Sequence, residues 1–371
     1  MDLCYHLAFS HFLGIGPVKF NALKNHFGSA KKAYLADKND LEEVIGVHLT
    51  EKFLDFRSKF DPDKKLEELK RKEIRVLCWD DKNYPQSLKN ISDPPICLYI
   101  KGDMKILTGS VSNSIIFAIV GTRQPTSYGL QVAKKFSYEL AALGFSIVSG
   151  MAYGIDTIAH RACLDAEGKT IVVLGCGVDV VYPAANVYLY QQILQRGGAI
   201  VSEFPPGQFV LKGLFIARNR IISGLSKGVM IVEGLKDSGS LITARYAAEQ
   251  GKDVFAPPSP ITSIMAAAPN MLLKQGARLV TSVEDILEEF DMKITPKRKE
   301  DFLEKLAPDE KCVFSLLAEK PHSADEIALT LNKTANEILN ILSLMEIKGL
   351  IEKNKENHYQ LAYQTGPKYT S

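Results

Sequence analysis

The sequence lacks several features that would assign it to a specialised class of protein. No apolar run approaches the ~20 residues that a helix needs to cross a bilayer, and residues 1–16, MDLCYHLAFSHFLGIG, contain no basic leader before an apolar core. The charge is nearly balanced, with 45 basic and 43 acidic residues and a formal net charge of +2. We therefore expect a cytoplasmic protein without membrane insertion, and the overall charge does not by itself indicate a nucleic-acid partner.

The chain has few cysteines, and they are not arranged as a metal site. They are scattered, without a C-x-x-C pair and without histidines at metal-binding spacing: Cys4, Cys78, Cys97, Cys163, Cys176 and Cys312. This spacing favours reduced thiols in a protein core over a disulfide framework or a zinc site. We expect no metal ligands.

Two nucleotide-binding motifs are absent as well. After the apolar run at residues 114–120, Gly121 stands alone until Gly129, so the G-x-G-x-x-G fingerprint of dinucleotide enzymes is missing. The phosphate loop G-x-x-x-x-G-K-[ST] does not occur either. Hydride transfer and nucleotide hydrolysis by such a loop are disfavoured, and we expect no cofactor.

Residues 112–290 show a regular alternation of short strands and amphipathic helices. The strand patterns are β-branched and apolar, which is typical of parallel strands covered on both faces: residues 114–120, 145–149, 170–174, 199–202, 228–232, 253–256 and 277–280. Helical patterns separate them, among others at residues 128–143, 155–167, 187–196, 241–250 and 283–290. Repeated βα units of this length predict an α/β fold with a doubly wound parallel sheet, an extended Rossmann-like domain.

Two segments precede this Rossmann-like domain. Residues 1–56 predict a small N-terminal helical domain of helix-hairpin-helix or SAM-like type, with a Gly-x-Gly hairpin between two helical patterns. The hairpin could present N–H groups to a phosphate, or its glycines could only permit a tight turn. Residues 57–111 form a connecting segment with two strand-like runs, expected to add to an edge of the sheet or to bridge to the helical domain. Trp79 in this segment is expected in the core.

The C-terminal segment predicts a winged-helix-like domain. Residues 291–308 are expected to form a linker, and residues 309–365 contain three helical patterns followed by a small hairpin. The third pattern, residues 335–348, stands where a DNA recognition helix would be, but it carries the single cation Lys348 and two carboxylates. This composition favours contact with protein, or dimerisation, over duplex binding, and it disfavours a transcriptional regulator.

Small and polar residues follow the predicted strands at their carboxyl ends. Because parallel strands point the same way, we expect the loops that carry these residues to converge. The first loop lies within residues 118–129, AIVGTRQPTSYG, and combines a lone glycine turn, the cation Arg123 and a helix start that suits an anion. The other loops are residues 149–154, 175–177, 202–207, 233–234 and 238–240.

The most informative segment is residues 212–225, KGLFIARNRIISGL, which follows a Pro-Pro-Gly loop. It enters a helix with the cation Lys212, the ring of Phe215 and the run Arg-Asn-Arg. Cations that hold phosphates and a ring that stacks a base are what a single-stranded nucleic acid requires. The spacing alone fits equally well an ordinary helix start with arginines bound to carbonyls and a core phenylalanine.

Residues suited to acid–base chemistry also occur here. Asp156 and His160 are four positions apart on one helix, so the carboxylate could orient the imidazole, or both could be a buried polar pair that ties the helix to the sheet. Glu203 and Glu233 could pair as acid and base, or accept hydrogen bonds from loop N–H groups or from Arg220. Chemistry is permitted but not indicated, so we expect no catalytic residue.

Together these segments resemble the DNA-processing protein A (DprA/Smf) family of bacterial competence proteins. The matching motifs run in order through the sheet domain: IVGTR at 119–123, SGxAxGIDxxAH at 149–160, VLGxG at 173–177, YP at 182–183, SEFPPG at 202–207, FxxRNRIIxGL at 215–225 and SGSLITA at 238–244. The flanking domains also resemble the three-part layout of much of this family.

The resemblance implies a function without catalysis. Members look like single-stranded DNA chaperones that protect incoming strands in natural transformation, load the RecA recombinase and form homodimers through the sheet domain. For this chain it implies that Arg123 holds a phosphate beside the Gly121 turn, that Lys212 holds another, and that Phe215 stacks or packs on a base. The expected DNA-binding residues are Gly121, Thr122, Arg123, Ser149, Gly150, Lys212, Phe215, Arg218, Asn219, Arg220, Ser238 and Gly239.

The chain departs from the family pattern at one loop. Where the family reads Pro-Gly and then Gly-x-Asn-x-Leu-Ile, this chain has PPSP at residues 257–260 and APNMLL at residues 268–273, which removes positive-φ freedom.

The alternative function is a nucleotide-processing enzyme of the lysine-decarboxylase-like phosphoribohydrolase type, which also binds phosphates at strand ends. The Pro-Gly-Gly-x-Gly-Thr loop of that group is missing from the sequence.

Overall fold

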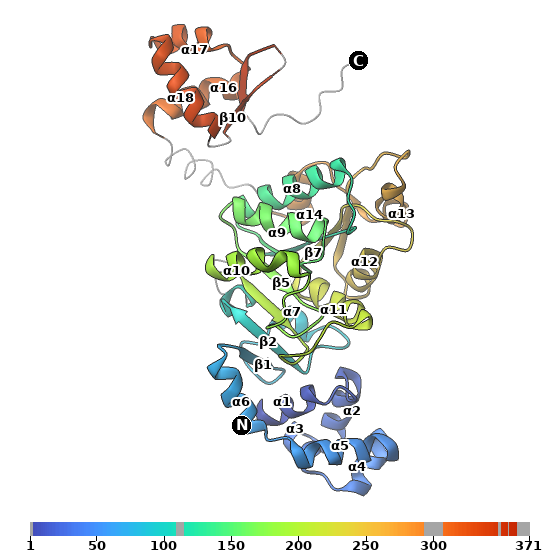
Figure 1. Cartoon of the computed structure of the whole chain (residues 1–371). Coiled ribbons are helices and arrows are strands. Elements are labelled where there is room, and N and C mark those ends of the chain that lie inside the picture. Colours follow the sequence, from blue (N-terminus) through green and yellow to red (C-terminus); the bar gives the residue numbers. More distant parts are fainter. Residues whose placement is uncertain (1–2, 109–114, 293–306, 348–349, 355, 362–371) are drawn as a thin grey trace. The chain divides into compact units, whose positions relative to one another are not determined.

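The structure is a computed structural model that describes residues 3–108, 115–292, 307–347, 350–354 and 356–361. The chain divides into two compact units, Met1–Met292 and Lys293–Ser371, drawn from blue to brown and in red in Figure 1. Each unit has its own apolar core. Most of the expected linker at residues 291–308, and Lys348, lie outside the described residues.

The first unit is built on a nine-stranded sheet in the order β1-β2-β6-β5-β4-β3-β7-β8-β9. Seven of these strands pair in parallel: β3 (Ile116–Val120), β4 (Ser146–Ser149), β5 (Thr170–Val173), β6 (Ala199–Ser202), β7 (Gly228–Ile231), β8 (Asp253–Ala256) and β9 (Arg278–Leu279). They are the predicted strands, each at or slightly inside its expected range. The predicted fold class, a doubly wound and mostly parallel sheet, is confirmed.

The connecting segment supplies one edge of this sheet. Strand β1 (Arg75–Cys78) pairs antiparallel with β2 (Cys97–Gly102), and β2 pairs antiparallel with β6. Between and after them lie helix α7 (Gln86–Lys89) and the 3₁₀ turn η1 (Met104–Leu107). The segment therefore adds to the sheet edge, and it also contacts the helical part, since the Trp79 and Phe20 rings lie 5.0 Å apart.

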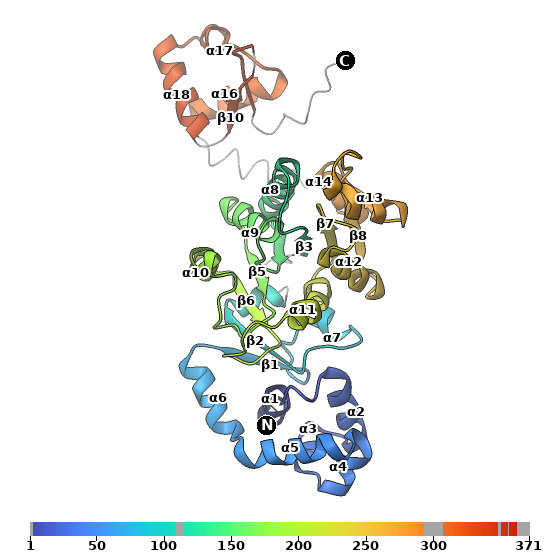
Figure 2. The same cartoon turned by 45° about the vertical axis from the view of Figure 1, so that its right-hand side comes forward.

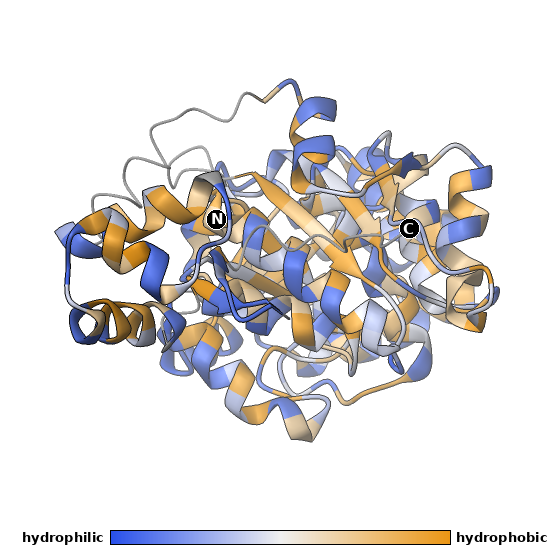
Figure 3. Ribbon diagram, turned by 90° about the horizontal axis from the view of Figure 1, so that it is seen from above, coloured by the Kyte–Doolittle hydropathy of each residue, from blue (hydrophilic) through white to orange (hydrophobic). Residues whose placement is uncertain are grey.

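Helices cover both faces of the sheet, as Figures 1 and 2 show. They are α8 (Ser127–Ala142), α9 (Ile155–Asp165), α10 (Val187–Gln195), α11 (Lys212–Leu225), α12 (Gly239–Glu249), α13 (Ala267–Lys274) and α14 (Val283–Glu289), with the 3₁₀ turns η2 (Ala184–Asn186) and η3 (Ile264–Ala266). Alternate residues of β3 enter different cores: Phe117 and Ile119 pack with α8, α9 and α14, whereas Ala118 and Val120 share a core with α11 and α12. In Figure 3 the central strands are accordingly coloured as hydrophobic, whereas hydrophobic and hydrophilic residues alternate along the helices.

The N-terminal part of the first unit is helical, as predicted: α1 (Leu3–His11), α2 (Pro17–Phe27), α3 (Ala30–Leu35), α4 (Lys38–Ile45), α5 (Val47–Lys59) and α6 (Pro62–Arg71). Phe9 stacks on Phe53 in its core, with 5.1 Å between the ring centroids. This core continues into the sheet, because the Tyr99 hydroxyl of β2 lies 2.5 Å from Ser10 Oγ. Trp79 is buried, which confirms its expected place in the core.

The second unit has the predicted order of three helices and a hairpin. The elements are α16 (Pro308–Glu319), α17 (Ala324–Leu331), α18 (Ala335–Ile347), β10 (Ile351–Lys353) and β11 (Tyr359–Leu361). The two strands pair antiparallel, and Leu317, Ile327 and Leu342 form the centre of the core. Within the described residues of both units, no helix is long and apolar enough to cross a membrane.

Candidate nucleic-acid interface

The loops at the carboxyl ends of β3, β4 and β7 lie against one another. Thr122 accepts a hydrogen bond from the Ile155 N–H through its carbonyl, 3.2 Å away, and donates its own N–H to the Glu233 carbonyl at 2.8 Å. Gly154 has φ +75°, and a Cβ there would lie 2.5 Å from the Thr122 carbonyl oxygen, so the close approach requires glycine. The expected convergence of these loops is confirmed.

The start of α8 is closed by a carboxylate of the protein itself. Glu233 is buried, and it accepts hydrogen bonds from the Thr126 N–H at 2.9 Å and from Thr126 Oγ1 at 2.6 Å. A Cβ at Gly129 would collide with the same carboxylate. The helix start therefore already holds an internal anion. The expectation that it offers free N–H groups to an external anion is wrong, because β7 brings a residue from a distant part of the chain onto it.

Two expected DNA-binding residues, Arg123 and Phe215, lie side by side at the carboxyl ends of the strands. The guanidinium carbon of Arg123, after β3, lies 5.6 Å from the centroid of the Phe215 ring in α11, within reach of a cation–π contact. Arg123 is exposed and Phe215 is partly exposed. Phe215 rests on the loop after β5, where a Cβ at Gly175 would lie 3.0 Å from its Cδ1 atom. Lys212 is exposed in the first turn of the same helix.

Arg218 points into the protein rather than into solvent. It is 4% exposed, and its Nη1 donates to the Gly150 carbonyl at 2.9 Å and to the Val173 carbonyl. Burial lowers its pKa to about 10, while the Asp156 carboxylate acts in the opposite direction. Asp156 in turn accepts hydrogen bonds from the Gly150 N–H at 3.1 Å and the Ala152 N–H at 3.3 Å. Arg218 thus ties α11 to the ends of β4 and β5.

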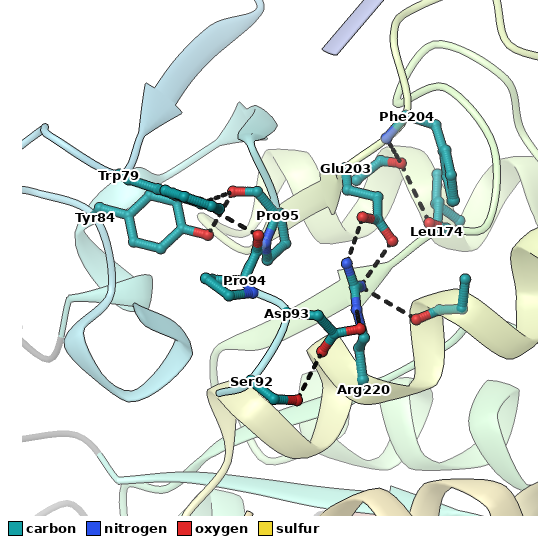
Figure 4. Close-up of polar contacts among 12 residues, drawn as sticks. Trp79, Tyr84, Ser92, Asp93, Pro94, Pro95, Leu174, Glu203, Phe204 and Arg220 are labelled. Atoms are coloured by element: carbon teal, nitrogen blue, oxygen red, sulfur yellow. Dashed lines mark hydrogen bonds and ion pairs between the residues drawn. The ribbon is translucent and has the colours of Figure 1, made fainter. Parts of the chain in front are cut away.

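Arg220 is held in a buried ion-pair network, shown in Figure 4. It is 3% exposed, its Nη1 and Nη2 donate to the two Glu203 oxygens at 2.8 and 2.6 Å, and its Nε donates to Asp93 at 2.8 Å. Burial acts to lower the pKa of Arg220, but the two carboxylates together raise it. The segment with Asp93 is fastened by Trp79 and Tyr84, which both donate to the Pro95 carbonyl.

The remaining expected residues differ in how far they reach solvent. Ser149 is fully buried and donates to the Ile119 carbonyl at 2.7 Å. Asn219 donates to the Gly239 carbonyl at 3.3 Å, and Ser238 is the N-cap of α12. Among the twelve expected residues, the exposed ones are Arg123, Lys212 and Gly239, the partly exposed ones are Gly121, Thr122, Phe215, Asn219 and Ser238, and the buried ones are Ser149, Gly150, Arg218 and Arg220.

The possible acid–base pairs are not formed. His160 Nδ1 lies 2.6 Å from Thr170 Oγ1, whereas Asp156 binds backbone N–H groups. Both side chains are buried, so they tie α9 to its surroundings separately and not as a pair. Glu203 and Glu233 follow β6 and β7, which are separated by three strands. Each accepts hydrogen bonds elsewhere in the chain, as the second of their two interpretations expects.

Sequence reasoning missed three residues that shape this surface. Thr126 and Asp93 bind Glu233 and Arg220, and neither stands out in the sequence because its partner is distant in the chain. Tyr182 stood in the sequence only as part of the YP motif at residues 182–183, and nothing in the sequence placed it beside Phe215. Its ring lies 5.5 Å from the Phe215 ring, measured between centroids.

The comparison with known proteins identifies the family. Residues 75–291 match the family model described as DNA recombination-mediator protein A. The chain belongs to this family. Residues 297–355 match the DprA winged helix domain, so the expected resemblance to the DprA/Smf family and the winged-helix prediction are both confirmed.

Relatives within the DNA recombination-mediator protein A family cover most of the chain. The chain is 35% identical to Protein Smf of Synechocystis sp., over 97% of this chain and 98% of that protein. It is 44% identical to DNA processing protein DprA of Bacillus subtilis, over 58% of this chain and 71% of that protein. The match with Smf spans both units of the fold.

Two solved structures share the fold. The X-ray structure of DprA from Streptococcus pneumoniae has a TM-score of 0.67 and 34% identity, and covers 78% of this chain and 97% of that chain. A structure of DNA processing protein A from Helicobacter pylori, described as showing a single-stranded DNA binding mode, has a TM-score of 0.52 and 34% identity, and covers 59% of this chain and 95% of that chain.

Proposed function

We propose that this protein binds single-stranded DNA at the carboxyl edge of its sheet and protects incoming strands in natural transformation. The observation that carries the proposal is the meeting of Arg123 with Phe215, 5.6 Å apart, beside the exposed Lys212. The relative from Helicobacter pylori, described as binding single-stranded DNA, supports the same ligand. We place this activity in the cytoplasm.

The geometry suits a single strand because it combines charge with a stacking ring. Arg123 and Lys212 are exposed cations that neutralise phosphates, and the Phe215 face stacks a base without reading its edge. Such a site binds with little sequence preference. Arg218 and Arg220 take no direct part in this mechanism; their buried bonds hold α11, and with it Lys212 and Phe215, in place.

The proposed function is tested by titrating the full chain with fluorescent oligo-dT and with a duplex of the same length at several salt concentrations. We expect tight binding of the single strand, weaker binding of the duplex, and affinity that falls linearly with the logarithm of salt concentration. Equal affinity for the two forms, or affinity insensitive to salt, would contradict the proposal.

The protein acts in this proposal without a catalytic residue or a cofactor. If the protein were instead a phosphoribohydrolase, Glu233 would be its candidate acid–base residue. Its carboxylate accepts hydrogen bonds from Thr126. The matching experiment is an assay for release of a free base from a nucleoside monophosphate. Release that is lost in Glu233→Gln would favour the enzyme over the DNA-binding protein.

We further propose that the protein forms a homodimer and loads the RecA recombinase. Ile261 and Ile264 are exposed in the loop that departs from the family pattern, and Leu279 is exposed on β9, the last strand of the described sheet. Exposed apolar side chains on an edge strand and on the loop after β8 suit a second copy of the chain. The dimer is tested by sedimentation, which should show a dimer that Ile264→Asp dissociates. RecA loading is tested separately: DNA-dependent ATP hydrolysis by RecA should start sooner when the protein is present.

A further inference from the structure

Two aromatic side chains outside the expected set reach solvent near Phe215, Tyr182 beside its ring in space and Phe209 six residues before it in the chain. Tyr182, in the loop between β5 and η2, is 41% exposed, and Phe209, in the loop between β6 and α11, is 77% exposed. Burying a phenylalanine ring stabilises a fold, and a ring left mostly in water contributes little to that. The core of the sheet domain therefore does not explain Phe209, and it leaves two fifths of the Tyr182 side chain in solvent.

The loops that carry these two rings are joined to each other. The Gly207 N–H donates to Asp179 Oδ1 at 2.7 Å, and the Gly177 N–H donates to the Gln208 carbonyl at 2.9 Å. A Cβ at Gly177 would lie only 2.8 Å from the Gly207 nitrogen, so no larger residue fits between the loops. Residues 177–182 and 205–209 thus form one continuous surface, which we call the double loop.

The double loop leads directly to the proposed DNA site. The Tyr182 ring lies 5.5 Å from the Phe215 ring and is tilted by 46° to it. The guanidinium carbon of Arg123 lies over the same Phe215 ring, 5.6 Å from its centroid. Along the chain, Lys212 stands three residues after Phe209 and three before Phe215. Aromatic rings therefore alternate with cations here, which is the arrangement that a single strand uses for its bases and phosphates.

We propose that Tyr182 and Phe209 are additional base-stacking residues, so that a bound single strand runs from Phe215 across the double loop. This inference rests on the proposed function and extends it by two positions. The occupant is the base of a single strand and not an apolar protein segment, because the cation Arg123 lies over Phe215 and the exposed Lys212 stands between Phe209 and Phe215 in the chain. Stacking needs only the face of a base, so the extension adds affinity without sequence preference.

The experiment compares two oligomers of equal length, oligo-dT and an abasic strand that keeps the phosphates and sugars but lacks every base. We expect Tyr182→Ala and Phe209→Ala each to weaken oligo-dT binding by between about fivefold and about a hundredfold. Binding of the abasic strand should not change, because the variants remove no charge. Tyr182→Phe should restore oligo-dT binding, since the ring and not the hydroxyl does the stacking.

The matched control is Tyr188→Ala. Tyr188 is also 77% exposed but stands on α10, outside the double loop, so its loss should leave oligo-dT binding unchanged. The inference is overturned if both alanine variants bind oligo-dT like the wild type, or if each loses oligo-dT and abasic binding to the same extent. A wild type that binds neither strand would instead overturn the proposed function, which separates the two failures. Circular dichroism confirms that each variant is folded.

Discussion

Arg123 and Phe215 lie in contact although they follow strands that are not neighbours. The guanidinium carbon is 5.6 Å from the ring centroid, while β4 and β5 separate β3 from β6 in the sheet. The contact exists because the loop of Arg123 leans over Gly154 and α11 leans over Gly175, and neither glycine carries a side chain that would hold them apart. A cation and a ring 92 residues apart in sequence thus become one surface.

The first prediction concerns the charge of this surface. Arg123→Ala and Lys212→Ala should each weaken oligo-dT binding and reduce the slope of log affinity against log salt by about 0.7, the value for one single-strand phosphate. Fluorescence anisotropy at four or more salt concentrations measures the slope. Unchanged slopes in both variants would remove these two residues from the site.

Lys227→Ala is the control for this experiment. Lys227 is exposed, and its N–H donates to the Ile116 carbonyl at the opposite, amino end of β3. It carries the same charge as Lys212 but lies at the amino ends of the parallel strands, away from the proposed DNA site. Its removal should leave the salt slope unchanged.

The second prediction uses a glycine that supports Phe215. A Cβ in Gly175→Ala would lie 3.0 Å from Phe215 Cδ1 and 3.1 Å from the Phe215 backbone nitrogen, so Phe215 and the start of α11 must move by a few tenths of an ångström. We expect weaker oligo-dT binding, up to the ~1–3 kcal/mol that a stacked base contributes, although Gly175 itself need not touch DNA. Gly213→Ala, also near the start of α11, has open space around the new Cβ and should bind normally.

The third prediction concerns the buried ion pairs of Arg220. Arg220→Ala leaves the Glu203 and Asp93 carboxylates without their cation, and breaking such a pair costs about 3–5 kcal/mol of unfolding free energy. Denaturant unfolding followed by circular dichroism measures the loss. Arg245→Ala removes an exposed arginine paired with Glu249 and should change stability by less than about 1 kcal/mol. Equal effects of the two variants would contradict the structural role of Arg220.

The fourth prediction is a dependence of stability on pH. Burial lowers the pKa of His160 to about 3, and Arg218 acts in the same direction. The unfolded chain binds a proton at this residue below pH ~6.5 and the folded chain does not, so stability is full above pH ~6.5 and falls as the pH is lowered towards 3. Between pH ~6.5 and pH ~5 the loss should reach about 2 kcal/mol.

His160→Gln isolates this contribution, since glutamine does not titrate. Urea unfolding at half-unit pH intervals should show a shallower decline for the variant than for the wild type between pH ~6.5 and pH ~5. Other titrating groups are shared by both proteins and cancel in the comparison. Parallel curves would show that His160 binds protons equally in the folded and unfolded chains, which contradicts its lowered pKa.

The sequence left open whether the two arginines turn inward or face a ligand. Residues two apart on a helix point in nearly opposite directions, so Arg218 and Arg220 can both be buried only where α11 is enclosed on opposite sides. Their partners, Asp156, Glu203 and Asp93, come from three segments distant in the chain. The predicted direct contacts of these arginines with DNA remain untested, and the structure gives their N–H groups acceptors within the protein.

The sequence by itself determined the elements and the family, because strand and helix patterns, glycine turns and short motifs are local properties of the chain. It also indicated Arg123, Lys212 and Phe215, whose side chains reach solvent. Only the tertiary structure decided that Glu233 binds the start of α8, that Arg218 and Arg220 are buried and bonded to acceptors within the protein, and that Tyr182 lies beside Phe215. These facts depend on which distant segments the sheet order places together, and hydrogen bonding and burial then settle the role of each side chain.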